Sequence, residues 1–357
     1  MTTCRHFGTC GGCALQDLTP EDYRVLKRKL VCDALAREAL GGVMVEELVQ
    51  VPLHSRRRAV FKLAKSGGTV ELGFHAARSH DIVDMRECQV LTPGLFGLVS
   101  DLRTALAPIL HDGEKADLHA TETATGLDLA FRLPRKLTPA LTAQIAGAFA
   151  ARNVARIIFN DQIVLEQQKP QLRLGPALVN LPPQAFLQAT AAGEAALQAR
   201  VLALTEGAKN IADLFAGLGT FTLPLAVHAR IHAVEQNGAA LEALASAARG
   251  TQGLKPVTTE KRDLFKSPMS PLELATFDAV VLDPPRAGAL AQVKALAASK
   301  IGSIAYVSCD ATSFARDARV LADAGFVPGP VAPIDQFLFS MHIELVAGFT
   351  RIKGGRS

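Results

Sequence analysis

The C-terminal half of the chain alternates short apolar runs with stretches rich in alanine and leucine, and this alternation constrains the fold more than any other feature. The runs hold few charged residues, as strands do when helices cover both faces of their sheet. Strands that alternate with helices in this way form parallel α/β sheets. We therefore predict an α/β, Rossmann-like sheet with strands at 210–215, 230–235, 277–283, 303–309 and 343–349.

The remainder of the 357-residue chain is long enough for a second, smaller domain. Residues 19–22, Thr-Pro-Glu-Asp, combine an N-cap, a proline and an acidic first turn, and so begin a helix that ends before Gly41-Gly42. The apolar face of this helix should carry residues at helical spacing: Leu26, Leu30, Ala34 and Leu35.

Strand patterns follow that helix. Residues 59–63 and 70–74 flank Gly67-Gly68, as the two strands of a hairpin do. Prolines then gather between 170 and 183 and suggest a boundary. We predict an N-terminal cysteine-cluster segment with its helix at 1–44, a central α+β domain at 45–174 and the Rossmann-like domain at 175–357.

Composition indicates the cellular compartment of the protein more than its function. No stretch reaches the roughly 18 apolar residues of a membrane span, and the first residues lack the apolar core of a signal peptide. The net charge is +4, which by itself says little about nucleic acid. We expect a cytoplasmic protein with no membrane contact and no obligate protein partner, whose thiols stay reduced.

A glycine-rich turn follows the first strand of the predicted sheet. Residues 213–220, Asp-Leu-Phe-Ala-Gly-Leu-Gly-Thr, bring backbone close to a ligand at the mouth of such a sheet. The third glycine of a dinucleotide fingerprint is missing, so a pyrophosphate cradle is not favoured. Glu235 ends the next strand, where an acid can accept hydrogen bonds from ribose hydroxyls. The pattern indicates a nucleoside cofactor such as S-adenosylmethionine; the alternative is a structural tight turn.

Three further strands carry reactive residues at their ends. Asp283 follows one strand and precedes two prolines, Cys309 follows the next, and Glu344 lies in the segment that opens the last. In this architecture ligands bind outside the carboxyl ends of the strands. The alternatives are that Asp283 begins a turn, that Cys309 is a small buried apolar residue, and that Glu344 is an edge charge.

Four of the six cysteines have the spacing of ligands. Cys4, Cys10 and Cys13 lie within ten residues together with three glycines, and Cys88 is the natural fourth member. Four thiolates suit an iron–sulfur cluster or a tetrahedral zinc ion, and the three-plus-one grouping favours the cluster. Cys32 lies on the N-terminal helix and is interpreted as a core or incidental residue.

Taken together, these pieces resemble the RNA uracil-5 methyltransferases, which use S-adenosylmethionine to make 5-methyluridine. The resemblance runs in family order over nearly the whole chain. It rests on Cys4-x5-Cys10-Gly-Gly-Cys13-x-x-Gln16, Arg56-Arg57-Arg58-Ala59, Ile82-Val83-Asp84 with Cys88, Phe186-x-Gln188, residues 213–226, Asp283-Pro-Pro-Arg-x-Gly288, Ser308-Cys309-Asp310 and His342-x-Glu344.

The resemblance implies a class I methyltransferase fold and roles for individual residues. Cys309 matches the nucleophile and Glu344 the general base. The cofactor-binding positions are Gln188, Phe215, Gly217, Glu235, Asp263 and Asp283. Cys4, Cys10, Cys13 and Cys88 match the [4Fe–4S] ligands of the members that act on ribosomal RNA, and we expect a 23S type without the family's N-terminal barrel domain.

Some residues depart from the family pattern. The family's Phe-x-Gln-x-Asn has Thr190 in its last position, and its Ser-Cys-Asn-Pro ends here in Asp310-Ala311. A proline and a threonine before the His-x-Glu are replaced by Leu338 and Ser340. These changes affect substrate positioning, whereas the nucleophile and base positions are intact.

The chemistry explains why these residue types are needed. A thiolate that adds to C6 of uracil makes C5 nucleophilic, and a base must then remove the C5 proton so that the thiol can leave. The target base must be flipped out of its stack to be reached. Alternatives are a transfer-RNA uracil-5 methyltransferase, a nucleic-acid amino-methyltransferase, which needs no cysteine, and a non-catalytic iron–sulfur RNA-binding protein.

RNA is the expected partner, ribosomal RNA in the first place. A basic run without acids, Arg56, Arg57, Arg58, Lys62 and Lys65, is a candidate for phosphate contacts. A solvated strand face is the alternative. Phe186, near Gln188, is a candidate for stacking on a base or an ordinary core residue.

Overall fold

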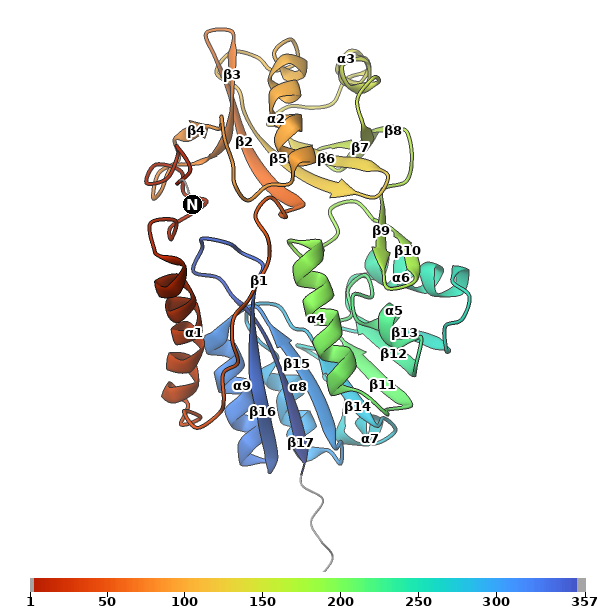
Figure 1. Ribbon diagram of the computed structural model, residues 1–357. Coiled ribbons are helices and arrows are strands. Elements are labelled where there is room, and N and C mark those ends of the chain that lie inside the picture. The colour runs from red at the N-terminus through yellow and green to blue at the C-terminus, as the bar shows by residue number, and fades with distance from the viewer. Residues whose placement is uncertain (1–2, 352–357) are drawn as a thin grey trace, which may run out of the picture.

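The protein is described from a computed structural model, in which residues 3–351 are placed. Two sheets form two lobes along the long axis of the molecule, and the short hairpin β9 (Gln171–Leu174) and β10 (Ala177–Asn180) lies between them (Figure 1). Within residues 3–351, every helix is too short or too polar to span a lipid bilayer.

The sheet of the C-terminal lobe has the predicted α/β character. Its strand order is β1-β16-β17-β15-β14-β11-β12-β13. The predicted runs become β11 (Asn210–Leu214), β12 (Arg230–Glu235), β14 (Ala279–Leu282), β15 (Ser303–Ser308) and β17 (Glu344–Arg351). Pairing is parallel except at β17, which runs antiparallel to β15 and β16. The prediction of a wholly parallel sheet is wrong there, because residues 336–343 are too few for a crossover.

Besides the short strand β1 (Val49–Gln50), two strands of this sheet were not predicted from the sequence. β13 (Val257–Lys261) is an edge strand with mostly exposed side chains, so it has no apolar run. β16 (Phe326–Asp335) contains Pro328, Pro330 and Pro333, and its register shifts between Pro328 and Val331. Proline within a run usually argues against a strand, but here a bulge accommodates it.

Helices cover both faces of the sheet, as predicted. On β11 and β14, side chains such as Leu214 and Val280 join the core beneath α8 and α9, whereas Ile211 and Val281 join the core beneath α4. This alternation is what a strand buried on both faces requires. The helices are α4 (Ala191–Leu204), α5 (Thr222–Leu225), α6 (Gly238–Gly250), α7 (Pro271–Leu274), α8 (Leu290–Ala298) and α9 (Ala311–Asp323).

The other lobe is built on a seven-stranded sheet of order β4-β3-β2-β5-β6-β7-β8. The predicted hairpin is confirmed: β2 and β3 pair antiparallel around Gly67-Gly68. Helices α2 (Pro93–Leu106) and α3 (Pro139–Phe149) contribute to its core. The strands are β2 (Arg58–Ser66), β3 (Thr69–His75), β4 (Ile82–Asp84), β5 (Lys115–Thr123), β6 (Gly126–Arg132), β7 (Val154–Phe159) and β8 (Gln162–Glu166).

The N-terminal helix α1 (Pro20–Arg37) begins as predicted, with the Thr19 hydroxyl accepting a hydrogen bond from the Asp22 N–H at 3.1 Å. Its buried stripe differs from the prediction: Leu26 and Leu30 are half-buried, while Tyr23, Lys27 and Val31 are buried. Cys32 is exposed, so it is not a core residue. After α1, the short strand β1 (Val49–Gln50) pairs with β16, so part of the range predicted for the central domain joins the C-terminal sheet.

Candidate active site

The sheet brings three of the predicted site residues to one edge. Ser308 pairs with Leu345 across β15 and β17, so the next residues in this antiparallel register, Cys309 and Glu344, lie side by side. Asp283 follows β14, the parallel neighbour of β15, and its N–H donates to the Leu214 carbonyl at 3.3 Å. The thiol and the two carboxyl groups therefore share the mouth of the sheet.

Burial raises the pKa of each of these three acidic side chains. It raises the pKa of Cys309 to about 11, and the negative charges of Glu344 and Asp283 add to the effect. The pKa of Glu344 is raised to about 7 by burial, against a hydrogen bond from Gln336 and the positive charge of Arg58. Burial, with the charges of Glu344 and Asp213, holds the pKa of Asp283 well above its ordinary value. Such a cluster of perturbed acids in a crevice is typical of a catalytic site.

The side chain of Gln336, for which the sequence predicted no role, connects the site residues. Gln336 is buried, and its Nε2 donates to Glu344 Oε1 at 3.1 Å and to Gln188 Oε1 at 2.6 Å. Gln188, predicted to bind the cofactor, is thereby placed beside the predicted base. Gln336 lies in the same sequence segment as His342 and Glu344, and this proximity was the only signal. A glutamine does not by its residue type indicate a role in the site.

The glycine-rich turn after β11 forms the other wall. Phe215, Gly217 and Gly219 all have positive φ, of 63°, 54° and 91°. The Gly217 N–H donates to Glu235 Oε2 at 3.0 Å, and the Asn237 N–H donates to Glu235 Oε1 at 2.7 Å. A Cβ on Gly219 would lie 2.9 Å from Leu244 Cδ1, so the turn needs glycine there.

A buried carboxylate lies beneath that turn. Asp213 accepts a hydrogen bond from Thr222 Oγ1 at 2.5 Å on one oxygen, while its buried Oδ1 has no hydrogen-bond partner among residues 3–351. Burial raises the pKa of Asp213 to about 7. An orphaned buried oxygen at the foot of a glycine turn is suited to a ligand that brings a donor.

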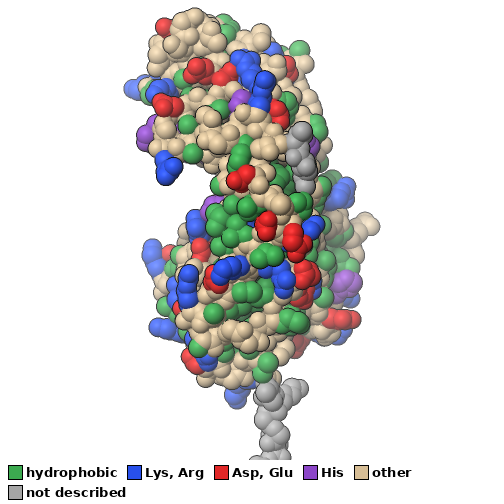
Figure 2. Space-filling model, turned by 60° about the vertical axis from the view of Figure 1, so that its left-hand side comes forward, with side chains coloured by type: hydrophobic (Ala, Val, Ile, Leu, Met, Phe, Trp, Pro, Cys, Tyr) green, Lys and Arg blue, Asp and Glu red, His purple; other side chains and the backbone are tan. Residues whose placement is uncertain are grey.

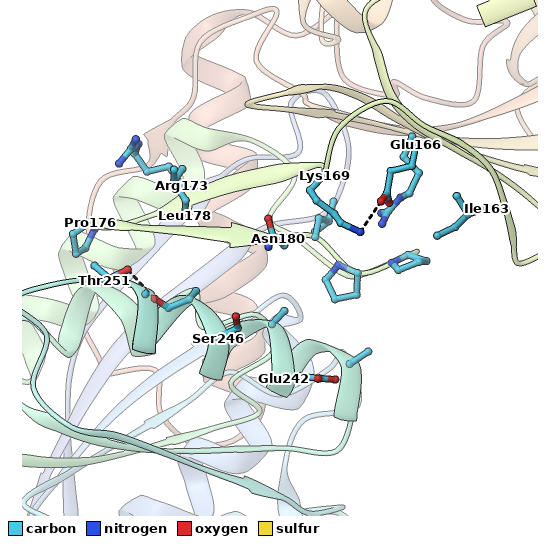
Figure 3. Close-up of a pocket in the computed structure, with 18 of the residues that line it drawn as sticks. Ile163, Glu166, Lys169, Arg173, Pro176, Leu178, Asn180, Glu242, Ser246 and Thr251 are labelled. Carbon is cyan, nitrogen blue, oxygen red and sulfur yellow. Dashed lines mark hydrogen bonds and ion pairs between the residues drawn. The ribbon is translucent and has the colours of Figure 1, made fainter. Parts of the chain in front are cut away.

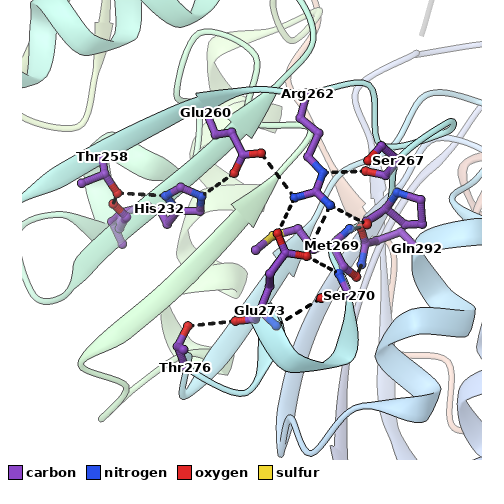
Figure 4. A network of polar contacts seen from close by, with 12 residues as sticks. His232, Thr258, Glu260, Arg262, Ser267, Met269, Ser270, Glu273, Thr276 and Gln292 are labelled. Atoms are coloured by element: carbon purple, nitrogen blue, oxygen red, sulfur yellow. Dashed lines mark hydrogen bonds and ion pairs between the residues drawn. The ribbon is translucent and has the colours of Figure 1, made fainter.

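Asp263 lies in the loop after β13, beside the same wall. Its Oδ1 accepts from the Phe265 N–H at 3.0 Å, and the Phe265 ring packs against Phe215 with centroids 5.4 Å apart. A polar network behind the loop holds it in place (Figure 4). At its centre Arg262 donates to Glu273 Oε1 at 2.7 Å and to the Ser267 carbonyl at 2.6 Å.

Two departures from the family pattern prove to be helix caps. The Thr190 hydroxyl accepts from the Gly193 N–H at 2.9 Å and caps α4. Asp310 accepts from the Thr312 and Ser313 N–H groups at 3.0 and 2.9 Å and caps α9. Asn, Thr and Asp are all good N-caps, so these replacements preserve the local structure on both sides of the site.

The four predicted cysteine ligands line one cavity of about 110 Å³: Cys4, Cys10, Cys13 and Cys88. The N-terminal loop is docked on β3, where the Gly11 N–H donates to the His75 carbonyl at 2.9 Å. Burial raises the pKa of Cys13 to about 11 and that of Cys88 above its ordinary value. Among residues 3–351, no three His, Cys, Asp or Glu side chains are arranged to hold a metal ion.

The cysteine loop and α1 hold the loop that precedes Glu344. The Ala14 and Leu15 N–H groups both donate to the Phe339 carbonyl, at 2.7 and 3.1 Å. Lys27 donates to Asp335 Oδ1 at 2.9 Å and to the His342 carbonyl at 2.6 Å, and both members of this ion pair are fully buried. The Tyr23 hydroxyl donates to Asp335 at 2.5 Å. The sequence signal for the Lys27–Asp335 ion pair is a lysine on the buried face of a helix, but the sequence does not identify its partner.

Most of the basic run is engaged inside the protein. Arg57 pairs with Glu194 at 2.7 Å, Lys62 pairs with Asp117 at 2.7 Å, and Lys65 donates to the Ala107 and Leu110 carbonyls at the end of α2. Three of the five residues predicted to contact phosphates are thus paired within the protein, and their RNA contacts remain a prediction. Local acceptors, which the sequence does not show, decide this outcome.

Two arginines of that run face a groove between the lobes. Arg56 and Arg58 line a pocket of about 390 Å³ together with His119, Phe186 and Phe337. The Arg58 guanidinium lies 4.5 Å from the centre of the Phe186 ring, which is 65% exposed. Phe186 is thus a surface residue, which excludes the core interpretation. The charge of Glu344 acts on Arg58, although Glu344 does not line this groove.

Other features of the surface say less about where a ligand binds. The view in Figure 2 shows a hollow between the two lobes and basic side chains interspersed with acidic ones. A wider groove of about 940 Å³ lies between the hairpin β9–β10 and α6 (Figure 3). Its Lys169 pairs with Glu166 at 2.6 Å, and none of the predicted site residues lines it.

Sequence comparisons agree with the resemblance. The family model described as tRNA (Uracil-5-)-methyltransferase matches residues 150–351. An uncharacterised RNA methyltransferase from Rhizobium meliloti is 44% identical over 350 residues, covering 96% of this chain and 84% of its own. A 23S rRNA (uracil(1939)-C(5))-methyltransferase RlmD from Chromohalobacter salexigens is 34% identical over 369 residues, covering 98% of this chain and 76% of its own.

The fold has a counterpart among solved structures. A Pyrococcus abyssi tRNA (uracil-54, C5)-methyltransferase, in complex with S-adenosyl-L-homocysteine, superposes with a TM-score of 0.75 at 23% identity. The match covers 95% of this chain and 86% of that one. The two-lobed arrangement with a Rossmann-like methyltransferase sheet is therefore a known fold.

Proposed function

This chain belongs to the family of RNA uracil-5 methyltransferases, and on that premise we propose that it methylates C5 of a uridine in ribosomal RNA through a covalent Cys309 adduct. The observation that carries the proposal is the adjacency of Cys309 and Glu344 across β15 and β17. A nucleophile and a base on one side of a crevice are what C5 methylation needs, whereas methylation of an amino group needs no such cysteine.

Cys309 begins the reaction by adding to C6 of the uracil, which forms the C–S bond and places the electron pair on the enolate of the ring. C5 would then take the methyl group from the sulfonium sulfur of S-adenosylmethionine, whose S–CH3 bond breaks so that S-adenosylhomocysteine leaves. Because burial and two neighbouring carboxyl groups raise the pKa of Cys309, thiolate is scarce in the free protein at neutral pH. Thiolate formation is therefore expected to follow ligand binding.

Glu344 completes the reaction by removing the C5 proton, after which the C–S bond breaks and the thiolate leaves. Its pKa of about 7 suits a base that works near neutral pH. Burial raises the pKa of Asp283 well above its ordinary value and so favours its protonated form, whose O–H would donate to a carbonyl of the uracil or to the cofactor.

The cofactor wall fits S-adenosylmethionine, which supplies a methyl group on a positively charged sulfur. Two observations support this fit: the Oδ1 of Asp213, which lacks a hydrogen-bond partner within residues 3–351, and the open space within 4 Å of a Cβ placed on Gly217. We propose that Glu235 accepts from the ribose hydroxyls, since lone pairs remain beyond its two backbone contacts. In this proposal Phe215, Gly217, Asp263 and Gln188 also contact the cofactor.

We propose that the four cysteines hold a [4Fe–4S] cluster. One zinc ion brings its thiolates within about 4 Å of one another, since each Zn–S bond is about 2.3 Å. A cubane binds each thiolate through a different iron, so the sulfurs stand farther apart around a cavity. The proposal rests on the one cavity that all four cysteines line; among residues 3–351 no three His, Cys, Asp or Glu side chains are arranged to hold a metal ion. A colourless, zinc-loaded protein from anaerobic purification would overturn this assignment.

Ribosomal RNA is proposed as the substrate because the Chromohalobacter relative is described as a 23S rRNA enzyme and matches nearly the whole chain. The test is to map 5-methyluridine in ribosomal and transfer RNA from cells with and without the gene. Loss of one ribosomal site is expected. Loss confined to transfer RNA would replace the substrate assignment, and full activity of Cys309→Ser would instead favour amino-group methylation.

A further inference from the structure

We propose that Gln336 is a positioning residue that fixes the directions of both the Glu344 carboxylate and the Gln188 amide. This inference rests on the proposed function, in which Glu344 is the base and Gln188 borders the ligands. Gln336 itself directly follows β16 and is 1% exposed, and its side chain is hydrogen-bonded to Gln188, Glu344 and Thr190.

The hydrogen bonds of Gln336 allow one orientation of its amide. The Nε2 donates to Glu344 Oε1 at 3.1 Å and to Gln188 Oε1 at 2.6 Å, and the Oε1 accepts from the Thr190 N–H at 3.4 Å. A flipped amide would set its oxygen against the Glu344 carboxylate and leave the Thr190 N–H facing an NH₂ group. Unsatisfied or repelling groups in a buried site cost more than an ordinary hydrogen bond yields, so the flip is disfavoured.

The space for Gln336 is shaped by a glycine. Gly193, in the first turn of α4, would place a Cβ 2.7 Å from the Gln336 Cβ. On the other side, Asp335 is held by Tyr23 and Lys27, which fixes the backbone from which Gln336 projects. The side chain is therefore confined by α1, β16 and α4 together.

The contact with Gln336 determines which oxygen of Glu344 is free and favours the ionised form of its carboxyl group. Gln336 is the hydrogen-bond donor to the Glu344 side chain within residues 3–351, and it binds Oε1, which leaves Oε2 to face the C5 proton. The bond stabilises the carboxylate against its burial, together with Arg58 on β2. The other titratable groups that act on this site, Asp283 and Cys309, are acids whose charge would oppose ionisation.

For Gln188, the contact decides which end of the amide faces the ligands. Its Oε1 is occupied by Gln336, so its two N–H donors turn away from Gln336. Gln188 should therefore present donors to an accepting group, a carbonyl or a carboxylate, on the bound ligand. One glutamine thus sets the base and a ligand contact on opposite sides of itself.

The test compares Gln336→Met with a matched control. Gln292 is equally buried and uses its amide in the same way, accepting from the Met269 N–H at 2.8 Å and donating to the Met269 carbonyl at 3.2 Å, away from the site. Gln292→Met therefore reproduces the loss of a buried amide without touching Glu344. A second variant, Gly193→Ala, displaces Gln336 while keeping its chemistry.

With uridine-containing RNA and S-adenosylmethionine, the covalent protein–RNA complex and product release are followed on denaturing gels from about pH 6 to about pH 9. For Gln336→Met we expect the complex to accumulate about tenfold over wild type, because proton removal is slowed. The pH midpoint of release should rise by about one unit, since the carboxylate loses a donor. Gly193→Ala should raise both the level of the complex and the pH midpoint of release, whereas Gln292→Met should change neither quantity.

Two further arms separate the possible failures. S-adenosylhomocysteine binding, measured by calorimetry, should weaken about fivefold in Gln336→Met but not in Gln292→Met, and this arm needs no catalysis. Unchanged binding, release midpoint and complex level in Gln336→Met would overturn the positioning role. Failure of wild type to form any complex with 5-fluorouridine RNA would instead contradict the proposed function itself.

Discussion

The two walls of the crevice are built in different ways. The cofactor wall comes from consecutive strand–turn–helix units, and its key contacts join Gly217, Glu235 and Asn237, which are near one another in sequence. The base wall is assembled from distant segments: Lys27 on α1 reaches Asp335, and Gln336 reaches Gln188 and Glu344. Backbone conformation determines the first wall, whereas buried side-chain contacts determine the second. Their sensitivity to mutation should differ accordingly.

The largest effect is expected where the base wall depends on a buried ion pair. Asp335→Ala leaves Lys27 fully buried without its carboxylate, which should cost about 3–5 kcal/mol of unfolding free energy. Urea unfolding measures it. The control Asp33→Ala removes the partner of Lys29 in a pair exposed to solvent, where the expected loss is below about 0.5 kcal/mol. Equal losses in the two variants would show that the N-terminal helix does not hold this wall.

The cofactor wall should respond to a change of backbone conformation. Gly219→Ala combines a φ of 91° with a close approach to Leu244, and should cost about 1–3 kcal/mol and weaken S-adenosylhomocysteine binding. Gly253→Ala is the control, because its φ of 83° is similar but open space surrounds it and it lies outside the site. Binding that survives Gly219→Ala unchanged would break the assignment of this wall to the cofactor.

A third change tests how the base wall acts on the nucleophile. Glu344→Gln removes a negative charge beside Cys309, so the pKa of Cys309 should fall from about 11 by about one unit. The pH dependence of Cys309 alkylation, followed on its own peptide by mass spectrometry, measures this. Glu242→Gln, on the exposed face of α6, should leave the profile in place. A rise or no shift with Glu344→Gln would mean that the two residues are not electrostatically coupled.

The smallest effect is expected in the groove between the lobes. Arg58→Ala removes a cation that stacks on exposed Phe186, and should weaken RNA binding by about 1 kcal/mol and reduce the salt slope by about one. Lys62→Ala is the control, since that lysine already pairs with Asp117. If Lys62→Ala reduces the salt slope more than Arg58→Ala, RNA binds along the strand face instead.

The difference between the walls also explains what the sequence could reveal. The strands that end in Asp283 and Cys309 were predictable because burial on both faces leaves continuous apolar runs. The cap of α1 and the glycine turn were predictable because both are local. β16 was not, since its prolines are tolerated by a bulge visible only in the sheet. Gln336, Lys27 and the partners of Arg57 and Lys65 were not, because each contact joins segments that only the fold brings together.

The central claim is that Cys309 and Glu344 act as nucleophile and base on one uracil. The most direct measurement is the capture of a covalent complex between the protein and 5-fluorouridine-substituted RNA in the presence of S-adenosylmethionine, because fluorine at C5 leaves the base no proton to remove. Wild type should be trapped, and Cys309→Ala should not. No complex with wild type, or an undiminished complex with Cys309→Ala, would contradict the mechanism.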